Sequence, residues 1–129
     1  MRFWNQIDDT VFFNMVFSYP APIDEVELFS ISIDNDRPQV VVLFDIPYLP
    51  DRPPKKWENY NRCRSGLVCL GVDSLLMKNI PIIDRFSVSV SRAEEVYHIS
   101  FSNSSSALEF RAKFISLSGP SVYLNEAPY

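Results

Sequence analysis

The feature that most constrains the fold of this chain is a strict alternation of apolar and polar residues. It runs through residues 86–91, 97–102 and 108–114, and only short polar breaks separate these segments. Successive side chains of a β-strand point to opposite faces of a sheet, so a period of two predicts strands with one buried and one solvated face. Short breaks favour antiparallel neighbours, and we expect a three-stranded meander. The phase shifts by one at Ile115 and Leu117, where the last strand should bend or end.

A second pair of strands is predicted nearer the start of the chain. Residues 26–33 alternate isoleucine and phenylalanine with serine, and residues 34–38 (Asp-Asn-Asp-Arg-Pro) form a turn signal. Residues 39–46 follow and are apolar on both faces, which is typical of a central strand that is covered on each side. Together the two segments predict an antiparallel hairpin.

Two further strands are predicted in the middle of the chain. They cover residues 62–72 and 75–80, and the first contains Gly66 and Gly71 as expected bulge or bend points. Later in the sequence, the pair Gly119-Pro120 predicts a turn.

Helical spacing occurs only near the N-terminus. Within residues 4–16, Trp4, Ile7, Val11 and Met15 recur at intervals of three to four, which predicts one short helix with a common apolar face. The prolines that follow end this helix, because proline and the residue before it resist helical geometry.

The length and composition fit one domain that covers residues 1–129. The chain has 129 residues, of which 47% are hydrophobic and 14% aromatic, so it can fill a core of its own. We expect a mainly β fold, an antiparallel sandwich or a strongly curved sheet with a short N-terminal helix. The alternative is an α+β arrangement with one larger helix on the sheet.

Charge and apolar patterning narrow the classes of partner. The formal net charge is −4, so nucleic acid is not expected as a partner, because phosphate binding needs clustered Lys and Arg. The longest apolar run, residues 40–44, is far shorter than a membrane span, and no signal-peptide pattern precedes it. Cys63 and Cys69 would lie about 20 Å apart in one extended strand, beyond disulfide reach. Free thiols fit a soluble protein of the cytoplasm.

No pattern predicts catalysis, a metal site or a cofactor. His98 is the only histidine and falls on the polar face of a predicted strand. Arg62 and Arg64 flank Cys63 and would lower its pKa if they faced it, but neighbours in a strand point to the opposite face. Two thiols and one histidine without a Cys-x-x-Cys pair argue against zinc. We therefore expect a protein that is not an enzyme.

The segment after the central strand is the best candidate for a functional site. Four prolines fall within residues 47–54, which makes this loop stiff and lowers the entropy lost when a partner binds it. Tryptophan and tyrosine, which are enriched at binding hot spots, follow directly. An alternative is that the tryptophan plugs one end of the sheet. The candidate partner-binding residues are Asp51, Arg52, Trp57, Glu58 and Tyr60.

Several of these features also carry a family resemblance. They are Trp4, the strand segments 26–33 and 40–47, the run Pro53-Pro54-Lys55-Lys56-Trp57, and residues 67–75. In these the chain resembles the immunity protein 50 family of bacterial polymorphic toxin systems. The resemblance implies a cytoplasmic antidote that binds and neutralises a cognate toxin domain and has no catalytic residues. An acidic chain would suit a basic toxin such as a nuclease.

Two other functions stay open at this point. One is a structural or assembly module that associates with itself, so the chain could be a monomer or a homodimer. The other is a small-molecule-binding β-barrel or an unrecognised enzyme, either of which needs a pocket. The inward positions Val88, Ile99 and Phe110 are bulky enough to fill such a pocket.

Overall fold

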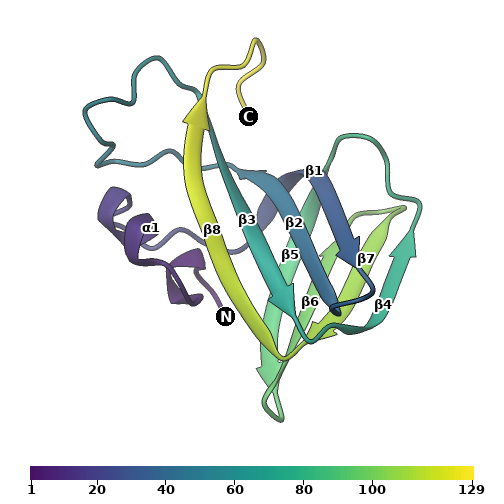
Figure 1. Cartoon of the computed structure of the whole chain (residues 1–129). Coiled ribbons are helices and arrows are strands. Elements are labelled where there is room, and N and C mark those ends of the chain that lie inside the picture. The colour runs from purple at the N-terminus through teal and green to yellow at the C-terminus, as the bar shows by residue number, and fades with distance from the viewer.

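The computed structural model describes residues 1–129 and consists of one eight-stranded antiparallel sheet with two short helical turns (Figure 1). The strand order is β4-β7-β6-β5-β1-β2-β3-β8. The strands are β1 (Glu25–Asp34), β2 (Gln39–Ile46), β3 (Arg62–Leu70), β4 (Asp73–Lys78), β5 (Asp84–Ala93), β6 (Val96–Ser102), β7 (Ala107–Ala112) and β8 (Phe114–Tyr123). The prediction of a mainly β fold with a strongly curved sheet is confirmed.

The core lies inside the curve of the sheet. Figure 1 shows β2 and β3 passing in front of β5 and β6, so the two halves of one sheet face each other. Phe44 of β2 lies between Trp4 and Phe101, with ring centroids 5.0 and 6.0 Å away. All three side chains are fully buried. The strands β4 and β8 remain at opposite edges, so the sheet is not closed and the β-barrel alternative is wrong.

The strongest sequence patterns correspond to the observed pairing. The segments 86–91 and 97–102 lie in β5 and β6, and residues 108–112 of the third segment lie in β7; the three strands pair in that order as a meander. The third strand ends two residues earlier than predicted, and Phe114, which the alternation placed on the buried face, begins β8 and is 67% exposed. The segments 26–33 and 39–46 form the hairpin β1-β2, and β2 is central because it also pairs with β3. The inward positions of the meander are buried as expected. These positions include Val88, Ile99 and Phe110.

The predicted N-terminal helix is wrong in extent and in face. The chain forms a 3-10 turn, η1 (Trp4–Gln6), and a separate helix, α1 (Val11–Val16). Between them Asp8 lies alongside β8 and Asp9 has a φ of 61°, which interrupts the helix. As a result Trp4 and Ile7 are buried in the core, whereas Val11 and Met15 are 78% and 65% exposed.

Three other predictions also differ from the structure. Gly119-Pro120 is not a turn but lies inside β8, where an edge strand tolerates a residue without an N–H. The strand predicted at 75–80 instead covers 73–78. In β1, an irregularity between Leu28 and Ser30 changes the register with β2, so the buried residues are Val26 and Leu28 rather than the later isoleucines.

Phe44→Ala should lower the free energy of unfolding by about 3–5 kcal/mol, because it removes a large side chain from the centre of the core. Phe114→Ala is the matched control, since Phe114 is 67% exposed at the start of β8. Urea unfolding of the two variants measures the difference. Equal losses of stability in both would contradict this view of the core.

Candidate protein-binding surface

The proline-rich loop is anchored to the end of α1. Asp51 accepts hydrogen bonds from the backbone N–H of Ser18 (2.8 Å) and from its hydroxyl. These bonds hold the pKa of Asp51 below its usual range. The N–H of Arg52 donates to the carbonyl of Val16 at 2.9 Å. The loop therefore has a fixed position even though it joins no strand.

Trp57 connects the loop to α1 through its side chain. Its ring meets Phe12 edge to face, with centroids 5.6 Å apart and planes at 84°. The backbone N–H of Trp57 donates to the carbonyl of Pro54 at 3.0 Å and closes a turn. Trp57 is half-buried and packs partly on the core, so it is both a plug and a contributor to the surface.

Helix α1 and the loop lie on one side of the sheet (Figure 1), and α1 exposes apolar side chains there. We call this region the α1–loop surface. Its apolar part has Val11, Phe12 and Met15 from α1 and Trp57 from the loop. The fixed geometry and an aromatic centre are properties of a protein-binding surface.

The five candidate residues from the sequence have different environments. Asp51 and Trp57 make the intramolecular contacts described above, whereas the Arg52 and Glu58 side chains are exposed. Tyr60 is half-buried. Sequence reasoning missed the exposed residues of α1. It found Val11 and Met15 by their spacing but assigned them to the buried face of a longer helix.

A network of charges lies on the outer face of the sheet, opposite the core. Asp45 alternates with the inward residues of β2 and is fully buried. It accepts hydrogen bonds from Arg62 Nη1 and Arg64 Nε, each at 3.1 Å, and from the Tyr123 hydroxyl. Arg62 Nη1 also donates to Glu27 at 3.0 Å.

The C-terminal segment covers this network. Arg62 Nε donates to the carbonyl of Ala127 at 2.9 Å, and the Tyr129 hydroxyl donates to Glu25 at 2.9 Å. Burial disfavours the charge of Arg62, but hydrogen bonds to Glu27 and Asp45 outweigh it and raise its pKa. Both oxygens of Asp45 are engaged by donors, so this carboxylate stabilises the sheet and is not presented to a ligand.

The two cysteines lie on the inner face and are both fully buried. The structure confirms that Arg62 and Arg64 point away from Cys63, since both bind Asp45 on the outer face. Burial raises the pKa of Cys63 and of Cys69 to about 12. Both thiols therefore remain protonated and unreactive in the folded protein.

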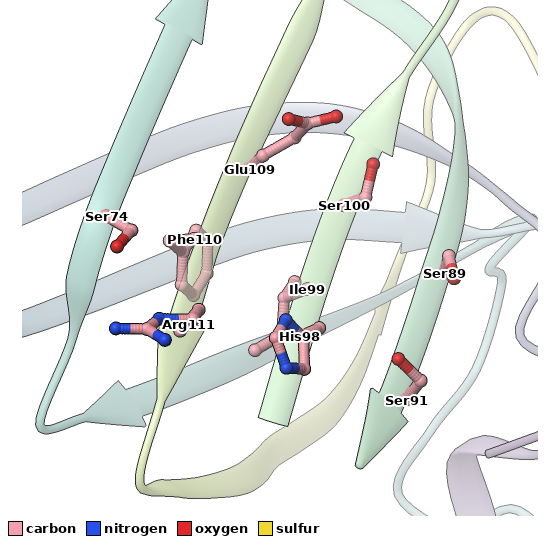
Figure 2. Close-up of a pocket in the computed structure, with 9 residues that line it drawn as sticks. All are labelled: Ser74, Ser89, Ser91, His98, Ile99, Ser100, Glu109, Phe110 and Arg111. Carbon is pink, nitrogen blue, oxygen red and sulfur yellow. The ribbon is translucent and has the colours of Figure 1, made fainter. Parts of the chain in front are cut away.

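A polar hollow lies over the outer face of the meander and contains His98 (Figure 2). It measures about 330 Å³ and is open to solvent. His98 makes no hydrogen bond to a serine or carboxylate there, and Arg111 is paired with Asp73 at 2.7 Å. Figure 2 shows the hydroxyls of Ser89, Ser91 and Ser100 spread along the strands rather than gathered around the imidazole. This arrangement does not form a Ser-His-acid triad.

Asp45→Asn should lower the free energy of unfolding by about 3–5 kcal/mol, because it leaves two arginines without their shared carboxylate in a buried site. The matched control is Asp73→Asn, which removes an exposed ion pair with Arg111 and should cost about 0–1 kcal/mol. Urea unfolding measures both. Equal losses of stability in the two variants would show that burial of the Asp45 network does not add to its contribution to stability.

Neither cysteine should react with Ellman's reagent at pH 8 in the folded protein, and both should react in urea. The folded thiols ionise near 12 and the unfolded ones near 9.0. The folded state therefore holds its protons more tightly, and its stability should fall as pH rises above 9.0. Rapid labelling of the folded protein would contradict the burial of these thiols.

Comparison with known proteins gives a family match for this chain. No curated protein and no solved structure matches the chain. None of its helices is long and apolar enough to cross a membrane. The family model described as immunity protein 50 matches residues 9–123. Because the match covers most of the 129 residues, the chain belongs to the immunity protein 50 family.

Proposed function

We propose that this protein is a cytoplasmic immunity protein that neutralises a cognate bacterial toxin domain by binding it in a one-to-one complex. The observation that carries the proposal is its membership of the immunity protein 50 family. The resemblance found in the sequence leads to the same function. The partner is thus another protein, encoded with the immunity protein in a polymorphic toxin system.

The α1–loop surface is the proposed site of toxin binding. Most exposed apolar residues of a soluble protein are scattered singly, and an apolar group with an aromatic centre is a mark of an interaction site. Here Phe12 contacts Trp57, and α1 also exposes Val11 and Met15. Because Ser18 and Val16 already hold the loop, little conformational entropy is lost when a toxin docks.

Charge supports a basic toxin, for which a nuclease is our specific candidate. The chain has 16 acidic and 12 basic residues, giving a net charge of −4. Complementary charge raises the association rate of two proteins and weakens with added salt. Neutralisation then requires only that the bound protein covers the toxin's active site or its substrate path.

Trp57→Ala and Met15→Lys should each weaken toxin binding by about 30-fold or more, which corresponds to the 2 kcal/mol of a hot-spot residue. Met15 is mostly exposed, so its substitution leaves the core intact. Calorimetry with the purified toxin domain encoded beside this gene measures the affinity. Protection of cells that express the toxin gives a second readout.

Leu76→Lys is the control variant, because Leu76 is an exposed apolar residue on β4, at the opposite edge of the sheet. It should bind the toxin as the unchanged protein does. If the unchanged protein fails to bind the toxin, the proposed function is wrong. If it binds and the Met15 and Trp57 variants bind equally well, the function stands and the site is elsewhere.

A further inference from the structure

The two edges of the sheet are treated differently by the rest of the chain. The N-terminal segment lies along β8, where the N–H of Leu117 donates to the carbonyl of Asp8 at 3.0 Å. By contrast, β4 pairs only with β7, and all six of its residues are exposed. An open edge of this kind presents unpaired backbone groups to any strand that can align with it.

The centre of β4 is unusually apolar for an open edge. Natural edge strands are commonly protected by charges, proline or bulges. β4 has an irregularity between Asp73 and Leu76, but its middle residues are Leu75, Leu76 and Met77. The segment that follows adds Ile82 and Ile83, which are 91% and 55% exposed. The side chains of this edge are therefore suited to contact with another apolar strand.

The sequence of β4 is complementary to itself. Its charges lie only at the two ends, Asp73 at the start and Lys78 at the finish. In an antiparallel pair of two copies, the start of each strand lies opposite the finish of the other. Each Asp73, which also pairs with Arg111 of its own copy at 2.7 Å, would then face a Lys78 from the second copy, so that opposite charges flank an apolar centre.

The faces of the strand also match in this arrangement. Leu76 lies opposite Glu109 on the outer face, and Met77 lies opposite Leu108 on the core face. Pairing centred on Leu76 places the two copies of Leu76 opposite each other on the outer face. It also places Leu75 opposite Met77 on the core face, because positions separated by two residues share a face. Counted without a bulge, this register would set Asp73 opposite Asn79 of the second copy. The irregularity between Asp73 and Leu76 takes up one extra residue of β4, so Asp73 lies on the outer face and opposite Lys78.

From this edge we infer that the protein forms a two-fold symmetric homodimer in which the β4 strands of two copies pair antiparallel. The two sheets become one continuous sheet, and each copy contributes the same residues to the interface. The α1–loop surface lies on the opposite side of the molecule from β4 (Figure 1), so dimerisation leaves it free. The dimer does not depend on the proposed function.

The size of the edge determines how tight the dimer is. Stable interfaces bury about 1,200–2,000 Å² in total. Two six-residue strands with their flanking isoleucines form a small interface by this measure. The dimer is therefore weak and concentration-dependent, with a dissociation constant in the micromolar range.

Sedimentation equilibrium over low micromolar to millimolar concentrations tests the dimer. The average mass of the unchanged protein should rise with concentration from that of one chain to that of two. Leu76→Lys should weaken the dimer at least tenfold, because it places two positive charges opposite each other at the symmetry axis. Met15→Lys, a similar change on the α1–loop surface, should dimerise as the unchanged protein does.

Two further measurements separate this interface from other effects. Lys78→Asp should also weaken the dimer, because it places a carboxylate opposite Asp73 of the second copy. This test does not depend on whether the Leu76 variant folds. Backbone amides of β4 should exchange hydrogen more slowly as the protein concentration rises, whereas those of α1 should not change.

The inference is overturned if the unchanged protein keeps the mass of one chain at all concentrations. It is also overturned if the folded Leu76 and Lys78 variants dimerise normally, since the interface would then lie elsewhere. If Leu76→Lys dimerises as the unchanged protein does but binds the toxin more weakly, the β4 edge is a toxin-binding surface and not a dimer interface. Loss of the dimer with normal toxin binding by Leu76→Lys would support both proposals separately.

Discussion

A single sheet without a covering layer can bury its apolar face only by curling onto itself, and most features of this protein follow from that constraint. Phe44 touches Trp4 from the N-terminal turn and Phe101 from the facing half of the sheet, so it joins the two halves and the N-terminal segment in one core. Because the curl stops before closure, two edge strands remain, β4 and β8. The exposed apolar residues of α1 lie near the β8 edge, and those of β4 lie on the other edge.

The same constraint explains the charged network on the outer face. A central strand has neighbours on both sides. The inner face of β2 is covered by the core, and its outer face is fully buried only at Asp45, beside the C-terminal segment, whereas Val41 and Leu43 are half-buried. A carboxylate at Asp45 is tolerated there only because Arg62 and Arg64 neutralise it and Tyr123 donates a further hydrogen bond. The network thus ties β2, β3 and β8 together and fixes the register of that half of the sheet.

The sequence predicts local patterns well and long-range contacts poorly. The meander and the hairpin could be predicted because alternation is a property of each strand by itself. The face of α1 could not, because a few apolar residues at helical spacing do not reveal that Asp9 interrupts the helix. The pair Gly119-Pro120 predicted a turn, because glycine and proline are common in turns. An edge strand can also hold them, and only the pairing of β8 with β3 distinguishes the two cases. The loop was identified from its composition, but its anchoring by Ser18 depends on a contact across 33 positions of the chain.

The two exposed apolar surfaces can act independently because the rigid core separates them. No hydrogen bond or ion pair joins α1 or the proline-rich loop to β4, and β4 lies at the edge of the sheet opposite to β8, the strand that α1 packs on. Substitutions at distant sites without shared partners have nearly additive effects. A toxin bound at one side would therefore leave the β4 edge unchanged, and pairing of two copies would leave each α1–loop surface in its original geometry. Independent surfaces of this kind allow the binding of a toxin and the association of two copies to be studied, and to evolve, one at a time.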